Sequence, residues 1–148
     1  MTFERSIVVA APRPWLFELM QDYDRRLDWD VFLSEARLVD ATQAGKGVRA
    51  WCVDRSGRGM ETEYVSFDPP NRVAVRMTQG PWYFERFAGA WIYEDDPAGT
   101  RVIFRYHLQT PRWLLGGDRL LARVFAHQMT KRLTVLKQRL ERLAAVSL

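Results

Sequence analysis

The sequence predicts an α+β protein in which a curved, seven-stranded antiparallel sheet wraps around one long C-terminal helix, with two short helices after the first strand. Three observations support this prediction. Strand patterns follow one another closely between residues 34 and 109, a helical pattern fills residues 118–146, and one strand with two short helical stretches precedes them. The chain has 148 residues, about the size of one domain, so we expect a single domain over residues 1–148.

The N-terminal elements follow from one strand pattern and two helical ones. Residues 3–10 (FERSIVVA) are rich in strand-forming side chains. Pro12 and Pro14 then open a short helix over residues 14–22 (PWLFELMQD), because proline fits the first turn of a helix. A second short helix or turn is expected in residues 22–30 (DYDRRLDWD).

Six strand patterns follow, separated by short turn signals rich in Gly, Pro, Asp and Asn. They cover residues 34–41, 47–55, 59–68, 72–79, 82–94 and 100–109. The connections are too short for crossover helices, so neighbouring strands are expected to pair antiparallel. Alternation along the last strand assigns an apolar, inward-facing set made of Val102, Phe104, Tyr106 and Leu108. In the preceding strand the same alternation groups Phe87, Gly89, Trp91 and Tyr93.

A long amphipathic helix ends the chain. We expect Asp118 to cap it at its N-terminus and the helix to run to about residue 146. Its apolar side chains recur with a period of about 3.6 residues: Leu121, Val124/Phe125, Met129, Leu133, Leu136, Leu140 and Leu143. An antiparallel sheet needs such a helix to cover its apolar face. Strong curvature of the sheet leaves a gap under the helix, which is the natural place for a ligand.

Composition excludes several classes of protein. With 47% hydrophobic and 27% charged residues the chain is neither disordered nor a coiled coil. Aromatic residues make up 13% of it, more than a plain core needs, which favours a cavity lined by rings. The single cysteine, Cys52, cannot form an internal disulfide, so a reducing, cytoplasmic location is expected. Only Cys52, His107 and His127 could serve as thiolate or imidazole ligands, and no metal-binding spacing joins them; we expect no metal and no cofactor.

The net charge of +4 is concentrated at the C-terminus, where residues 118–148 carry +5. A basic helix can bind a nucleic acid or a membrane surface. We favour a solvated helix face. A protein that binds single-stranded nucleic acid through aromatic side chains is disfavoured, because the aromatic residues lie on the strand face that the helix must cover. The expected partner is a hydrophobic small molecule, with no nucleic acid and at most weak contact with a membrane surface. No apolar run approaches the ~20 residues of a membrane span, and both a monomer and a homodimer remain open.

Four segments carry a resemblance to a known family. They are SIVVAAPRPWLFELMQD (residues 6–22), DPPNRVAVRMTQGPW (68–82), FAGAWIYEDDPAGTRVIFRY (87–106) and VFAHQMTKRLTVLKQRLE (124–141). Together they resemble the START-like, helix-grip superfamily of polyketide cyclases, lipid carriers and plant pathogenesis proteins. The likeness covers essentially the whole chain and implies the helix-grip fold. Locally it is strongest to bacterial polyketide aromatase/cyclases and, in the last hairpin and helix, to coenzyme-Q-binding carriers.

This resemblance implies roles for particular residues. In the aromatase/cyclases an arginine before a Thr-Gly-Pro-like turn faces the pocket, and Arg76 stands in that place. Trp29 matches a pocket tryptophan, and Tyr64 falls where the family has another aromatic residue. The resemblance thus implies that Arg76 and Tyr64 polarise a carbonyl or stabilise an enolate. The family pattern is incomplete, because a pocket tyrosine falls at Ala36 and a second pocket arginine at Asp68.

Strand parity, the helix stripe and the resemblance together give the expected ligand-binding residues. They are Trp29, Phe32, Ala50, Thr62, Tyr64, Arg76, Phe87, Trp91, Phe104, Tyr106, Val124, Gln128 and Arg132. Two functions stay open. The first is binding of a polyketide-, lipid- or isoprenoid-like molecule between sheet and helix, with polyketide cyclase, aromatase or dehydratase chemistry. The second is a non-catalytic lipid or quinone carrier. No Ser, His and acid stand at a spacing that indicates a nucleophilic triad.

Overall fold

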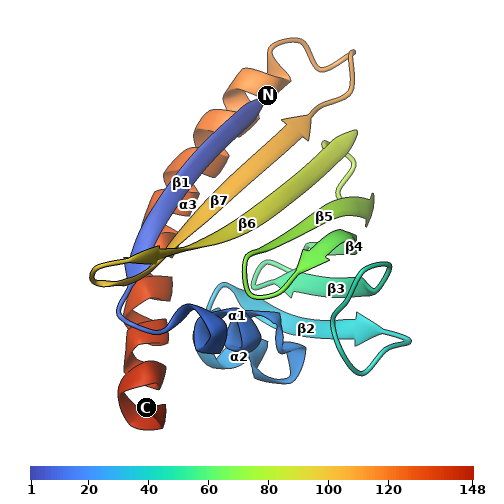
Figure 1. Cartoon of the computed structure of the whole chain (residues 1–148). Helices are drawn as coiled ribbons and strands as arrows, with labels where there is room; N and C mark the ends of the chain where they lie inside the picture. The colour runs from blue at the N-terminus through green and yellow to red at the C-terminus, as the bar shows by residue number, and fades with distance from the viewer.

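A computed structural model describes residues 1–148 and has the predicted layers (Figure 1). One antiparallel, seven-stranded sheet has the strand order β1-β7-β6-β5-β4-β3-β2. The strands are β1 (Thr2–Val9), β2 (Leu33–Val39), β3 (Arg49–Asp54), β4 (Gly59–Asp68), β5 (Arg72–Gln79), β6 (Arg86–Asp96) and β7 (Gly99–Gln109). The helices are α1 (Arg13–Gln21), the 3-10 turn η1 (Tyr23–Arg25), α2 (Arg26–Trp29) and α3 (Gly117–Ser147). The predicted α+β helix-grip architecture is confirmed.

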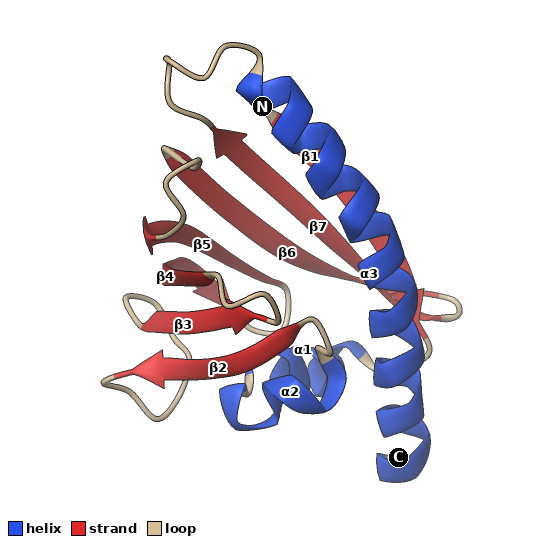
Figure 2. Ribbon diagram, turned by 180° about the vertical axis from the view of Figure 1, so that it is seen from behind, coloured by secondary structure: helices blue, strands red, loops and turns tan.

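The curl of the sheet sets the distance between each strand and α3. Figure 2 shows α3 running along β1 and β7, whereas β3 and β4 lie apart from it across the concave face. The short helices α1 and α2 sit at one end of this concave space, beside the C-terminal half of α3.

The inner face of the sheet follows the predicted parity. Val102, Phe104 and Leu108 are at most 1% exposed, whereas Arg105 between them reaches solvent and pairs with Glu4 of β1 at 2.8 Å. This alternation arises because successive side chains of a strand point to opposite faces. The sequence therefore predicted correctly which face of β7 meets the helix.

The turn between β6 and β7 contacts the end of β1, and glycine makes this possible. Gly99 has φ +138°, and a Cβ atom there would collide with the carbonyl oxygen of Val9. The next residue, Thr100, is fully buried and donates its hydroxyl to the carbonyl of Ala11 at 2.7 Å. Only a residue without a side chain tolerates both this backbone and this approach, so Gly99 fixes the corner from which α1 starts.

The long helix begins differently from the expectation. Gly116, in the left-handed region at φ 72°, occupies the N-cap position, so the prediction of Asp118 as the cap is wrong. The Asp118 carboxylate instead accepts hydrogen bonds from the Thr110 backbone N–H at 2.6 Å and from its hydroxyl at 2.7 Å. It joins the end of β7 to the first turn of α3. None of the helices has a stretch long and apolar enough to cross a bilayer.

The strand predicted over residues 82–94 begins later, at Arg86. Residues 82–85 form a connection after Pro81, in which Trp82 is 68% exposed and stacks on Trp113 with a centroid distance of 5.8 Å. Phe84 of the same connection turns inward and is buried. The aromatic residues that suggested a strand here belong to one loop. Trp82 lies on the outer surface of the protein, and Phe84 faces the interior.

Candidate functional site

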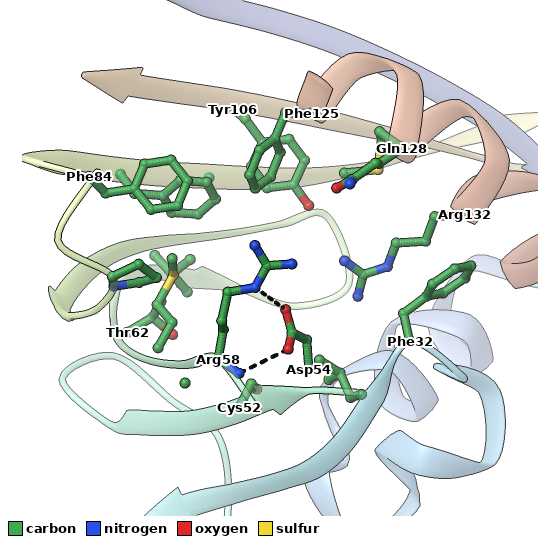
Figure 3. A pocket seen from close by; sticks show the side chains of 18 of the residues that line it. Phe32, Cys52, Asp54, Arg58, Thr62, Phe84, Tyr106, Phe125, Gln128 and Arg132 are labelled. Carbon is green, nitrogen blue, oxygen red and sulfur yellow. Dashed lines mark hydrogen bonds and ion pairs between the residues drawn. The ribbon is translucent and has the colours of Figure 1, made fainter. Parts of the chain in front are cut away.

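A cavity of about 740 Å³ lies between the concave face of the sheet and α3. The inner faces of β3 to β7 form one side, and residues 121–132 of α3 form the other. Of its 30 lining residues 17 are hydrophobic, which suits the apolar body of a small molecule. Figure 3 shows side chains from the sheet and from α3 pointing into this common space.

Aromatic rings form one end of the cavity. Phe84 lies 5.3 Å from Phe87 of β6 and 5.6 Å from Phe125 of α3, measured between ring centroids. Tyr106 of β7 continues the wall at 5.6 Å from Phe87. Gly89 makes room for it, since a Cβ atom there would lie 2.9 Å from the Tyr106 ring. Tilted and edge-on contacts of this kind are favourable for aromatic rings. The wall therefore offers a stable apolar surface to a ligand.

A network of hydroxyl and amide groups lies at the inner end. Tyr64 of β4 donates its hydroxyl to Oε1 of Gln21 at 2.7 Å, and Nε2 of Gln21 donates to the Tyr93 hydroxyl at 2.9 Å. The Tyr23 hydroxyl lies 3.5 Å from that of Tyr64. Burial raises the pKa of Tyr23 and of Tyr64 above the usual range. Both hydroxyls therefore stay protonated at neutral pH and can donate hydrogen bonds, but they cannot act as bases.

A buried ion cluster joins α2 to α3. The fully buried Asp30 accepts hydrogen bonds at Oδ2 from Arg26 Nε at 3.1 Å and from Arg132 Nη2 at 2.6 Å. Burial by itself would raise the pKa of Asp30, but the guanidinium groups of Arg132 and Arg26 outweigh burial and hold it below its ordinary value. One carboxylate thus serves two cations, which leaves the cluster with a net positive charge.

The guanidinium of Arg26 also lies against aromatic rings. Its central carbon is 4.8 Å from the centroid of Trp29 and 5.1 Å from that of Trp91. Cation–π contacts of this kind stabilise a desolvated guanidinium. Trp91 in turn donates its indole N–H to the Tyr106 hydroxyl at 2.9 Å. These contacts hold the polar end of the cavity in one arrangement.

The hairpin between β3 and β4 brings a further guanidinium, that of Arg58, to the cavity. Asp54 accepts hydrogen bonds from the backbone N–H groups of Ser56 and Arg58, both at 2.9 Å. The Arg58 side chain folds back so that its Nε donates to Asp54 at 3.1 Å, as the dashed lines of Figure 3 show. The hairpin is therefore ordered by its own side chains. No group of three His, Cys, Asp or Glu side chains is placed to hold a metal ion.

Comparison with known proteins identifies the family. The sequence model of the family described as polyketide cyclase / dehydrase and lipid transport matches residues 1–141. The chain belongs to this family. No curated protein matches the chain in sequence.

Solved structures share the fold at low sequence identity. TTHA0849 from Thermus thermophilus is 20% identical, with a TM-score of 0.78 and coverage of 99% of this chain and 100% of that one. The di-domain ARO/CYC StfQ from the steffimycin biosynthetic pathway is 14% identical, with a TM-score of 0.76 over 97% of this chain and 52% of StfQ. Ara h 8.0201 is 13% identical, with a TM-score of 0.74 over 99% of both chains. At these identities the likeness shows the fold alone.

Nine of the residues predicted for the ligand site line the cavity of this polyketide cyclase-family protein. They are Phe32, Thr62, Tyr64, Phe87, Trp91, Tyr106, Val124, Gln128 and Arg132. Those on the strands were found through strand parity and the resemblance, and those on α3 through the helix stripe. Gln128 and Val124 line the cavity and are also exposed to solvent, so they lie at its opening.

Four predicted residues do not line the cavity. Trp29 and Phe104 are buried behind Trp91, at centroid distances of 6.3 and 5.4 Å, and Ala50 is buried in β3. Arg76 lies on the outer face of the sheet, with its side chain 62% exposed and paired with Glu63 at 3.1 Å. The expectation that Arg76 faces the cavity is therefore wrong, because its neighbours in β5, Val73 and Val75, occupy the inner face.

The cavity also contains functional groups that sequence reasoning missed. They include Gln21, Tyr23, Arg26, Arg58 and Phe84, together with Asp30 directly behind the wall. A local signal existed for one pair only: Arg26 and Asp30 are four residues apart, the spacing of a helical ion pair. Gln21 and Tyr23 reach the cavity from α1 and η1, and Arg58 and Phe84 reach it from the connections that precede β4 and β6.

Proposed function

We propose that this protein binds a hydrophobic small molecule of polyketide, lipid or isoprenoid type between the sheet and α3. The observation that carries the proposal is the cavity of about 740 Å³ with its majority of hydrophobic lining residues. Small-molecule sites range from about 300 to 1,000 Å³ and combine apolar walls with a few polar groups. An apolar ligand would supply the contacts that the rings facing the cavity lack.

Titration with the neutral fluorescent probe N-phenylnaphthylamine tests this proposal. We expect saturable binding in the micromolar range, displaced by flat aromatic molecules or long-chain lipids.

Val75 lines the cavity and Arg76, next to it in β5, points outward. Val75→Trp should therefore fill the cavity and weaken probe binding at least about tenfold, whereas Arg76→Trp should leave binding unchanged. Absence of probe binding in the wild-type protein would refute the proposal. If the probe binds, extraction followed by mass spectrometry identifies the molecule that co-purifies with the protein.

We further propose that the cavity supports cyclisation, aromatisation or dehydration of a poly-ketone. The support is the protonated hydroxyl of Tyr23 at its inner end, which lies 3.5 Å from the Tyr64 hydroxyl, whose own proton is donated to Gln21. Hydrogen-bond donors held in place can polarise a ligand carbonyl and stabilise the enolate that forms from it. The shape of the cavity would bring distant parts of the chain together. Arg76 has no place in this proposal, because it lies on the outer face.

The catalytic proposal is tested with a synthetic poly-ketone thioester and product analysis by mass spectrometry. Wild-type protein should change the product distribution relative to buffer. Tyr23→Phe should lower the rate while probe binding stays within about twofold, because the ring remains and only the donor is lost. A product distribution identical to that in buffer would favour the carrier function.

The carrier alternative is supported by an exposed aromatic pair near the cavity. Trp82 and Trp113 are 68% and 69% exposed, and the neighbours of Trp82 in sequence, Pro81 and Tyr83, line the cavity. Exposed tryptophan is typical of surfaces at a membrane–water interface. We expect anionic vesicles to recruit the protein weakly, with recruitment lost near ~0.15 M salt. Salt-resistant recruitment that disappears in Trp82→Ser would establish the carrier function instead.

A further inference from the structure

The charged side chains that line the cavity are predominantly basic. Five of them are basic, namely Arg26, Arg55, Arg58, Lys131 and Arg132, and one, Asp54, is acidic. Asp54 is already paired with Arg58 at 3.1 Å and accepts three hydrogen bonds from its own hairpin. The cavity therefore has an excess of positive charge that its own side chains do not neutralise.

Arg132 carries the part of this excess that faces the ligand space. Its Nη2 donates to Asp30, whose Oδ2 also accepts from Arg26, so the single carboxylate is shared between two cations. Its Nε is buried and has no hydrogen-bond partner. The guanidinium lies over the ring of Phe32, 5.5 Å from its centroid, and Figure 3 shows it pointing into the cavity. The Nη1 group makes no hydrogen bond within the protein, so this edge of the guanidinium is left to pair with a group in the cavity.

The remainder of the cavity sets the other requirement for a ligand. The rings of Phe84, Phe87 and Phe125 lie 5.3 to 5.9 Å from one another. Figure 3 shows Phe84 and Arg132 at opposite ends of the space. A molecule that fills the cavity would place an apolar body against the rings and its other end beside the guanidinium.

From this arrangement we infer that the ligand is an amphipathic carboxylic acid, with its carboxylate paired to Arg132 and its apolar body against the aromatic wall. A guanidinium presents a planar fork of N–H donors that matches a carboxylate. A cation that is partly removed from water and shares its counter-ion gains most from a second anion. This inference rests on the proposed binding function and specifies the class of ligand for the same cavity.

Displacement of N-phenylnaphthylamine by matched pairs of competitors tests the inference. One pair is naphthaleneacetic acid and naphthaleneacetamide, and the other is myristic acid and myristamide. Within each pair the apolar body is identical and only the charge of the end group differs. We expect each acid to bind at least about tenfold more tightly than its amide, since a hydrogen bond to a charged partner contributes that much. The two pairs distinguish a flat ring from a flexible chain as the preferred body.

Variants assign this preference to a residue. Arg132→Gln should reduce the preference for the acid to within about twofold while the neutral probe still binds. Arg132→Lys keeps the charge but not the fork, and should retain part of the preference. The matched control is Arg139→Gln, an exposed arginine two turns further along the same helix and outside the cavity. It should leave the preference unchanged.

The possible results distinguish failure of this inference from failure of the proposed binding function. Equal binding of acid and amide by the wild-type protein overturns the inference and leaves the binding function standing. A preference that persists in Arg132→Gln also overturns it, because the carboxylate is then bound elsewhere. If the wild-type protein binds neither the probe nor any competitor, the binding function itself fails. If Arg132→Gln does not fold, the wild-type comparison and Arg132→Lys still decide the matter.

Discussion

The two halves of α3 belong to one amphipathic helix and yet have opposite surroundings. In the C-terminal half Leu133, Leu136 and Leu140 are at most 4% exposed and form solid core. In the N-terminal half Val124 is 44% exposed, Leu121 and Phe125 are half-buried, and all three border the cavity. The same apolar repeat thus builds a core at one end and a cavity wall at the other.

The short helices account for this difference. Leu16 and Met20 of α1 are fully buried and belong to the same core as Leu136 and Leu140 in the C-terminal half of α3. No helix fills the other end of the concave space, where the loop residue Phe84 and the strand residue Phe87 meet Phe125 across the gap. A helix stripe specifies which face turns inward, whereas the distance to its partner depends on what else occupies the space.

The largest effect is expected where the two halves meet, at the ion cluster. Asp30→Ala leaves the guanidinium groups of Arg26 and Arg132 without their shared carboxylate and should lower the free energy of unfolding by about 3–5 kcal/mol. Urea unfolding measures it, with Asp28→Ala, an exposed carboxylate in the adjoining short helix α2, as the control. A loss below about 1 kcal/mol would mean that water solvates the two guanidinium groups once their shared carboxylate is removed.

The same carboxylate should make stability depend on acid pH. Because the folded-state pKa of Asp30 lies below its ordinary value of 3.8, its contribution is complete above that value. The contribution is lost as pH falls through the lowered pKa. The urea midpoint, followed from neutral to acid pH, should therefore decline less steeply in Asp30→Asn than in the wild-type protein. Identical slopes would contradict the lowered pKa.

The next largest effect compares the two halves directly. Leu140→Ala should cost about 3 kcal/mol, because the fully buried side chain leaves a cavity in a packed core. Val124→Ala should cost less than about 0.5 kcal/mol, because nearly half of that side chain is exposed. Thermal and urea unfolding of both variants give the comparison. Equal losses would show that the N-terminal half is packed as firmly as the C-terminal one.

A smaller effect is expected at the boundary between core and cavity. Trp91 and Phe104 are directly paired across β6 and β7, but Trp91 borders the cavity and Phe104 is 1% exposed. Trp91→Ala should cost about 2 kcal/mol, because one side of the ring lacks packing contacts, whereas Phe104→Ala should cost about 3–5 kcal/mol. Trp91→Ala should also weaken N-phenylnaphthylamine binding sharply. Unchanged probe binding would place the ring in the core.

The smallest effect is expected on the outer face. Arg76→Leu removes a side chain that is 62% exposed and paired only with Glu63, so unfolding free energy should stay within about 0.5 kcal/mol of wild type. Probe affinity should also stay unchanged. A clear loss of binding in this variant would require Arg76 to reach the cavity and would reopen its proposed role in catalysis.

The outcome at Arg76 shows where sequence reasoning was reliable. Alternation in β5 puts Val73 and Val75 on one face and therefore Arg76 on the other, which is where the structure has it. The family resemblance placed Arg76 inside instead. Successive side chains of a strand point to opposite faces of the sheet, whichever strand it pairs with. A role transferred from a relative depends on register, and two irregularities interrupt the pairing of β4 with β5.

By itself the sequence determined the order of the elements, the antiparallel pairing, the inner face of β7 and the apolar stripe of α3. Each of these follows from the period of the side chains along one element or from the length of a connection. Only the tertiary structure decided that Arg26, Asp30 and Arg132 form one cluster, since Asp30 and Arg132 are 102 residues apart. It also decided that half of the stripe borders a cavity, because the curl of the sheet and the position of the short helices set how much space remains beneath α3.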